Sequence, residues 1–181
     1  VEPASELLKR IQAEKEQLIK DKKIKKQKAL PAITDDTKPF ELPDSWEWCR
    51  LGEVISSANN GIYKHVSFYN NDGVVSLRMY NIQDGEVNFT KARRVELSEE
   101  ELNKYELLEN DLLFNRVNSR ELVGKTAIIR KNSEPLVYES MNMRLRLIDH
   151  LVSEYINKYL LASNARTYFF NVCKIASGQV S

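Results

Sequence analysis

The sequence is poor in several residue types that catalytic and metal sites need. It has only two cysteines, Cys49 and Cys173, and two histidines, His65 and His150, and all four are far apart along the chain. They fit none of the usual zinc-ligand spacings. The six glycines form neither a G-x-G-x-x-G motif nor a P-loop. We therefore expect this chain to hold no metal ion and no cofactor.

Long apolar runs and a charge of one sign are also lacking. No stretch approaches the roughly 20 apolar residues that span a bilayer. The first apolar pair, Leu7 and Leu8, is followed at once by Lys9 and Arg10, unlike a signal peptide. We expect a cytoplasmic protein that does not enter a membrane. The net charge is only +1, so any nucleic-acid contact would need basic residues that folding gathers.

Motifs for chemistry on DNA are missing as well. An amino-methyltransferase that flips its base needs an Asn/Asp-Pro-Pro-aromatic loop, and the nearest segment, Lys38-Pro39-Phe40, lacks the polar residue and the second proline. Pro43-Asp44 begins a nuclease-like carboxylate pattern, but no Asp/Glu-x-Lys follows it. There is no G-x-S-x-G nucleophile elbow. The sequence therefore predicts a protein that is not an enzyme.

Three regions follow one another along the chain: a helical arm at 1–28, an extended connector at 29–45 and a packed domain at 46–181. Apolar residues lie on one side of a helix predicted over 5–27, with Ser5 as its N-cap. This helix is either solvated against the domain or a docking helix for a partner. Its candidate partner-binding residues are Leu7, Leu8, Ile11 and Leu18. The last residues end without a stop signal, so we expect the chain to be cut from something longer.

The packed domain is predicted to be α+β, with a small mixed and mainly antiparallel sheet and flanking helices. A turn at Asp84-Gly85 predicts a hairpin that joins the strand at 74–79 to the one at 86–90. Residues 98–101 form a capping box before a short helix. A later helix begins near Ser153 and is interrupted at 163–164. Strands are expected at 74–79, 86–90, 111–116, 124–129, 136–139 and 143–148.

Polar and basic residues collect in the loops of this domain. Arginine can pair with guanine edges and Asn or Gln with adenine, whereas Lys and Ser more often hold phosphates. Each cluster is also compatible with an ordinary turn or surface. The candidate DNA-binding residues are Tyr63, Lys64, His65, Arg78, Tyr80, Asn81, Arg116, Asn118, Ser119, Arg120, Lys125, Asn142, Arg144 and Gln179.

The order of several segments adds a resemblance. Residues 40–54 (FELPDSWEWCRLGEV) resemble the opening of target-recognition domains in the specificity subunits of type I restriction–modification systems. Residues 77–85 (LRMYNIQDG), 110–116 (NDLLFNR) and 122–127 (LVGKTA) are similar to three later motifs of that family, and 154–166 to its following helix. Residues 11–31 also look like the leader segment of one branch of these subunits. Asn110 stands where the family often has glycine.

This resemblance implies an amino-terminal target-recognition domain. Such a domain would read one half of a split site in double-stranded DNA. Modification subunits would hold the methyl donor, and a restriction subunit would cut. The segment around Arg116, Asn118, Ser119, Arg120 and Lys125 is then the strongest candidate for contact. Two alternatives stay open: a protein-interaction module that docks through the first helix, and the recognition domain of a fused restriction–methylation enzyme.

Overall fold

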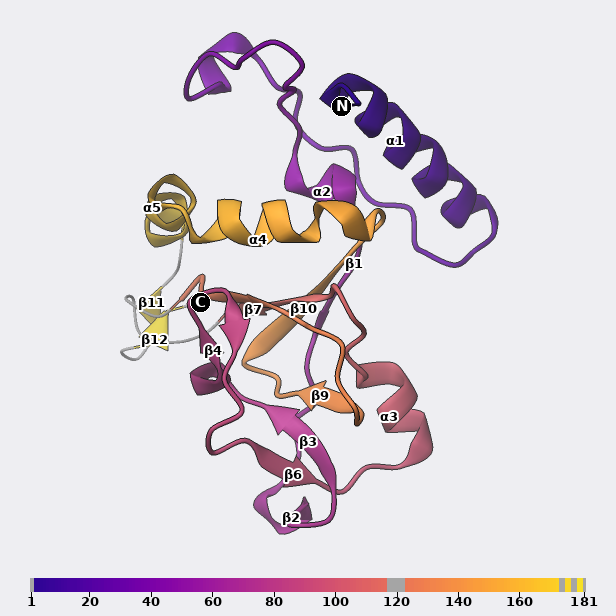
Figure 1. The fold of residues 1–181 in the computed structure, drawn as a ribbon, viewed down its shortest axis with the longest axis vertical. Helices are drawn as coiled ribbons and strands as arrows, with labels where there is room; N and C mark the ends of the chain where they lie inside the picture. The colour runs from indigo at the N-terminus through magenta and orange to yellow at the C-terminus, as the bar shows by residue number, and fades with distance from the viewer. Residues whose placement is uncertain (1, 117–122, 173–174, 177–178, 181) are drawn as a thin grey trace. The chain divides into compact units, whose positions relative to one another are not determined.

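The computed structural model describes residues 2–116, 123–172, 175–176 and 179–180 (Figure 1). The chain divides into two compact units. Unit 1 comprises Val1–Ser57 with Leu147–Asp149, and unit 2 comprises Ala58–Arg146 with His150–Ser181. The first unit thus extends to residue 57, beyond the connector that the sequence suggested would end at residue 45. None of the described helices is long and apolar enough to span a membrane.

Unit 1 contains the helix α1 (Ala4–Lys20), a 3-10 turn η1 (Asp35–Thr37) and the short helix α2 (Leu51–Val54). The predicted extent of the first helix, to residue 27, was wrong. The helix ends at Lys20 because Lys22 takes a left-handed φ of 58°, which stops helical hydrogen bonding. Ser5 is not the N-cap either, since it lies inside a helix that is capped at Pro3.

A buried lysine attaches α1 to α2. Lys15 is 7% exposed, and its Nζ donates hydrogen bonds to the carbonyl of Gly52 at 2.5 Å and of Glu53 at 3.3 Å. The side-chain oxygen of Gln27 accepts a third bond at 3.0 Å. Because burial disfavours the charged ammonium, the pKa of Lys15 lies below its usual value. The carbonyl partners satisfy a charge that would otherwise destabilise the unit.

Two four-stranded sheets lie mainly in unit 2. One has the order β1-β10-β7-β8, from β1 (Ile55–Asn60), β10 (Asn142–Leu147), β7 (Leu112–Asn115) and β8 (Thr126–Ile128). The other has the order β2-β6-β3-β9, from β2 (Tyr69–Asn70), β6 (Arg93–Val95), β3 (Val74–Leu77) and β9 (Leu136–Tyr138). The β3–β9 pair is parallel, whereas β2–β6, β3–β6, β7–β8 and β7–β10 are antiparallel.

Shorter elements complete unit 2. α3 (Glu99–Tyr105) precedes β7, and α4 (Ser153–Leu161) contacts β8 and is followed by α5 (Ser163–Val172). The 3-10 turns are η2 (Val66–Phe68), η3 (Met79–Asn81) and η4 (His150–Val152). Two small hairpins pair β4 (Ile82–Gln83) with β5 (Glu86–Val87) and β11 (Ile175–Ala176) with β12 (Gln179–Val180). The α+β prediction is confirmed.

Local sequence signals fix several of these elements. Asp84 and Gly85 have φ values of 48° and 89°, as a two-residue hairpin turn requires. The turn joins β4 to β5, so the expected pairing with the strand at 74–79 was wrong. The capping box is confirmed, because the Ser98 hydroxyl accepts from Glu101 N at 3.2 Å while Ser98 N donates to the Glu101 carboxylate at 3.0 Å. Asn110 is left-handed, with φ 69°.

The core of unit 2 lies between strands of the two sheets. Leu77, Leu113 and Ala127 are fully buried in it, together with the aromatic ring of Tyr138. An ion pair closes one side of this core. The carboxylate of Asp111, 2% exposed, accepts from Arg146 Nε and Nη2, each at 2.7 Å. A bidentate pair of this kind satisfies both oxygens of a carboxylate that has left water.

Gly61 supplies a first test of the packing. A Cβ at this position would stand 2.3 Å from the backbone carbonyl oxygens of Tyr138 and Glu139. Those oxygens belong to backbone and cannot move aside cheaply, so Gly61→Ala should destabilise the protein by about 1–3 kcal/mol. Chemical unfolding monitored by circular dichroism measures the loss. The matched control is Gly52→Ala, whose new methyl would meet only the flexible side chain of Leu30; equal effects would contradict this account.

The buried phenol of Tyr138 gives a test in alkali. Burial raises its pKa to about 12, while the unfolded phenol titrates near 10. Between these values the native state binds more protons than the unfolded state, so stability should fall as pH rises from about 10 to 12. Phenolate absorbance should show this late titration. Tyr138→Phe should reduce its amplitude without removing it, because the pKa of Tyr69 is also raised to about 12. Titration of all tyrosines near pH 10 in the folded protein would disagree.

Candidate nucleic-acid interface

Three loops that are distant in sequence meet on the short segment 139–141, which follows β9. Ile62 forms a parallel β-bridge with Glu139. The amide of Glu139 donates to the carbonyl of Leu77 at 3.0 Å, and the amide of Arg116 donates to Met141 O at 3.2 Å. We call the loops 61–65 and 78–81, with Arg116 and the segment 139–141, the rim. The strand ends thus collect three of the predicted polar clusters in one place.

The carboxylate of Glu139 organises the charged side chains of the rim. Its side chain is 13% exposed, and Oε1 accepts from Arg78 Nε at 2.5 Å and from the Tyr69 hydroxyl at 2.7 Å. Burial, with this hydrogen bond, raises the pKa of Tyr69 to about 12, so the hydroxyl stays protonated and donates. The Arg78 guanidinium also lies 5.7 Å and 5.9 Å from the ring centroids of Tyr69 and Tyr80. Contacts within the protein therefore fix the Arg78 side chain, which is only partly exposed to a ligand.

The loop 61–65 presents its side chains in different ways. Tyr63 is 80% exposed. His65 is also exposed, and its Nδ1 lies 2.9 Å from the Ser67 hydroxyl. Lys64 is instead paired with Glu101, at 2.6 Å between Nζ and Oε1. Tyr63 and His65 are thus available to a ligand, whereas the charge of Lys64 is offset.

The other predicted contacts near the rim are partly accessible. Tyr80 is 42% exposed, and its hydroxyl donates to a backbone carbonyl at 3.0 Å. Arg116 is half-buried and donates through Nε to the carbonyl of Ser140 at 3.1 Å. Lys125 is half-buried just before β8. Gln179 lies in β12. Three further predicted DNA-binding residues, Asn118, Ser119 and Arg120, lie outside the described residues.

Three predicted contacts are corrected, because the structure buries them. Asn81 is fully buried: its Oδ1 accepts from Arg78 N at 2.9 Å and its Nδ2 donates to Asn88 O at 2.7 Å, so it closes the η3 turn. Asn142 is also fully buried and donates to a backbone carbonyl of β3. Arg144 is 6% exposed and donates to the carbonyl of Glu106 at 2.6 Å. A polar residue type alone did not reveal that these side chains serve the interior.

One of the four predicted partner-binding residues of the first helix is buried. Ile11 is 2% exposed, so it is a core residue of that unit rather than a free contact, and this prediction is corrected. Leu7, Leu8 and Leu18 are half-buried.

Sequence reasoning missed three residues that shape the rim. Glu139 is an isolated acid after a strand, and Tyr69 stands alone in a loop-rich region. Arg93 belongs to an Arg93-Arg94 pair and lies 5.9 Å from the Tyr69 ring centroid. The arginine pair was the one available signal. The contacts themselves depend on strand pairing, which no local pattern specifies.

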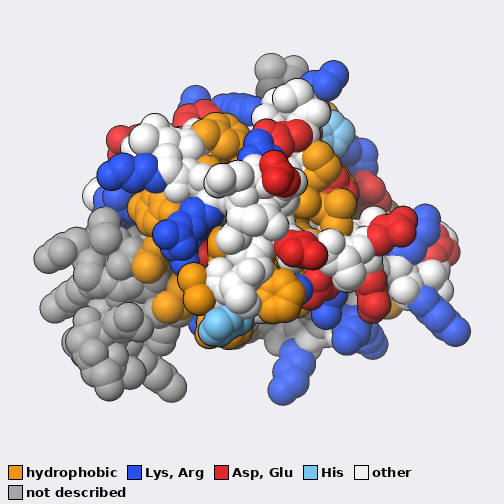
Figure 2. All heavy atoms as spheres, turned by 90° about the horizontal axis from the view of Figure 1, so that it is seen from below, with side chains coloured by type: hydrophobic (Ala, Val, Ile, Leu, Met, Phe, Trp, Pro, Cys, Tyr) orange, Lys and Arg blue, Asp and Glu red, His pale blue; other side chains and the backbone are white. Residues whose placement is uncertain are grey.

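The charge on the surface is mixed. Figure 2 shows Lys and Arg side chains interspersed with Asp and Glu over one face of the molecule. Among the residues that the structure describes, no group of three or more His, Cys, Asp or Glu is placed to hold a metal ion. The described side chains of the rim include hydrogen-bond donors, aromatic rings and separate cations.

Comparison with known proteins shows what this chain is similar to. No family model matches the sequence. The chain is similar to the specificity subunit of the type I restriction enzyme EcoEI from Escherichia coli, with 38% identity over 160 residues, covering 86% of this chain and 27% of the relative. The EcoAI specificity subunit of the same species is 43% identical over 140 residues, covering 74% and 23%. The EcoKI subunit of strain K12 is 36% identical over 152 residues, covering 81% and 32%.

A solved structure shares the fold. It comes from work on complex assembly and conformational transition of the type I R-M system, is 20% identical and has a TM-score of 0.51. The match covers 90% of this chain and 37% of the solved one. The chain spans about a quarter to a third of the length of the curated relatives named above. Along most of its own length, this chain is a homologue of part of the specificity subunits of type I restriction enzymes.

Proposed function

We propose that this chain is the amino-terminal target-recognition domain of a specificity subunit and reads one half of a bipartite site in double-stranded DNA. The observation that carries the proposal is the meeting of the loops 61–65 and 78–81 with Arg116 on the segment 139–141. Base reading needs a few directed donors and acceptors on a rigid support. Short loops that are hydrogen-bonded to strand ends provide such a support.

The chemistry of the exposed side chains agrees with this role. Tyr63, His65, Tyr80 and Arg116 combine aromatic rings with hydrogen-bonding groups, which suits base edges and sugar–phosphate together. Pairing of Lys64 with Glu101 lowers the uncompensated positive charge. A protein that merely coated DNA would gain from more free cations, not fewer. The rim thus favours selective contact over general attraction to the backbone.

The proposal divides the work among partners. This chain would supply the choice of sequence and no bond chemistry. Modification subunits would hold the methyl donor and act on the base, and a restriction subunit would cut the DNA. The choice of sequence agrees with the names of the relatives, which are specificity subunits of type I restriction enzymes. The roles of the modification and restriction subunits are those that the family resemblance implies.

Selection from random duplex DNA tests the proposal. The chain is mixed with the modification subunit of its own system, bound at low salt and sequenced over several rounds. We expect enrichment of one short motif. Binding without enrichment would reduce the function to backbone binding. Failure to bind, even with the modification subunit present, would contradict the proposal and favour a protein-interaction module.

A single substitution at the rim sharpens the test. Arg116→Ala should relax selection at one base position and cost about 1–3 kcal/mol there, if the guanidinium reads a base edge. Competition binding with single-base variants of the selected site measures this. Lys131→Ala removes one exposed positive charge from the connection between β8 and β9, outside the rim, and should leave selection unchanged. Equal weakening on every sequence would assign Arg116 to a phosphate instead.

A further inference from the structure

A hollow beside the rim has a composition that suits an anion. Its volume is about 520 Å³, and it is lined by Val66 and by the segments 69–71 and 92–94, which belong to β2, β6 and the residues next to them. The strands β2 and β6 lie next to each other (Figure 1). They pair antiparallel, with Asn70 opposite Arg94. Two arginines and two asparagines contribute to the wall. No carboxylate side chain is among the described residues that line it.

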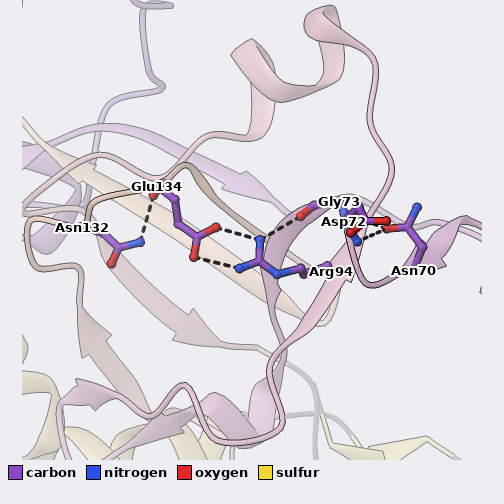
Figure 3. A network of polar contacts seen from close by, with 6 residues as sticks. All are labelled: Asn70, Asp72, Gly73, Arg94, Asn132 and Glu134. Atoms are coloured by element: carbon purple, nitrogen blue, oxygen red, sulfur yellow. Dashed lines mark hydrogen bonds and ion pairs between the residues drawn. The ribbon is translucent and has the colours of Figure 1, made fainter.

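The two arginines of the hollow differ in how their charge is used. Arg94 is neutralised: its Nη1 and Nη2 pair with both oxygens of Glu134 at 2.7 Å and 2.9 Å, and Nη1 also donates to Gly73 O at 3.0 Å (Figure 3). Arg93 is exposed and makes no ion pair with any carboxylate that the structure describes. Its guanidinium instead lies over the ring of Tyr69 at 5.9 Å. The net positive charge of the hollow therefore comes from Arg93.

Asn70 provides a further donor. Its Oδ1 accepts from the amides of Asp72 at 3.0 Å and Gly73 at 2.7 Å (Figure 3). The turn therefore occupies the acceptor end of the side chain and leaves Nδ2 as the donor end. Arg93 and Asn70 both line the hollow. A planar guanidinium and an amide NH₂ group can each donate hydrogen bonds to the oxygens of a phosphate ester.

Tyr69 connects this hollow to the rim. The same ring that carries Arg93 also faces the Arg78 guanidinium at 5.7 Å, and its hydroxyl donates to Glu139. An anion bound by Arg93 would therefore lie next to the loops that we propose to read bases. Phosphate contacts beside base contacts fix the register of a protein on its duplex.

We infer that Arg93 anchors a phosphodiester of the DNA backbone in this hollow. The inference rests on the proposed function and adds a contact that carries no sequence information. Its role is to hold the duplex against the rim while other side chains select the bases.

The salt dependence of binding tests this inference. The complex of this chain with the modification subunit is titrated with its selected duplex and with an unrelated duplex, over a series of salt concentrations. Arg93→Ala should weaken binding to both duplexes by the same factor. It should also lower the slope of log K against log salt by about 0.9, the value for one phosphate contact on B-DNA. Arg93→Lys keeps the charge and should retain the slope.

Lys131→Ala is the matched control, because it removes one exposed cation from outside the hollow. It should change neither the affinity nor the slope. Unchanged thermal unfolding of Arg93→Ala shows that the fold is intact. The inference is overturned if Arg93→Ala behaves like Lys131→Ala, or if its loss is confined to one base position. A wild-type complex that binds all duplexes equally would contradict the proposed function, while the slope would still decide the role of Arg93.

Discussion

The arrangement of the rim depends on one carboxylate that has largely left water. Glu139 follows a parallel strand whose neighbour, β3, ends at Leu77, and its oxygen must find partners because an unpaired charge at this depth is costly. It finds Arg78 and Tyr69, which come from different loops. The ion pair therefore does more than stabilise a strand end. Within the rim it holds Arg78 in place, whereas Tyr63 and His65 remain exposed to a ligand.

The sequence predicted the local structure better than the contacts. The hairpin turn at Asp84 and the capping box at Ser98 each depend on a few neighbouring residues, and both were foreseen. The pairing of Arg78 with Glu139 depends on residues 61 positions apart in sequence. Asn142 was misread for the same reason, since its burial follows from strand pairing and not from its chemistry. A site built at strand ends is thus predictable in location, whereas the use of each side chain is not.

Ion pairs between side chains of the same chain explain how a protein with a net charge of +1 can still present selected cations. Arg130 is shared between Glu86 and Glu154, and Arg94 is bound to Glu134. Exposed pairs of this kind contribute little to stability individually. They do cancel charge where it would attract polyanions indiscriminately. The positive charge that remains is concentrated at few positions.

The buried amine of Lys15 can report local unfolding of unit 1. The other lysines of α1, Lys9 and Lys20, are exposed and would react with an amine-directed reagent at once. Lys15 is bonded to two backbone carbonyls and has little contact with solvent, so it can be modified only when α1 separates from α2. The rate of its modification therefore measures local unfolding of this helix, independently of events in the sheets. The modification rate of this structural lysine thus reports how often α1 separates from α2.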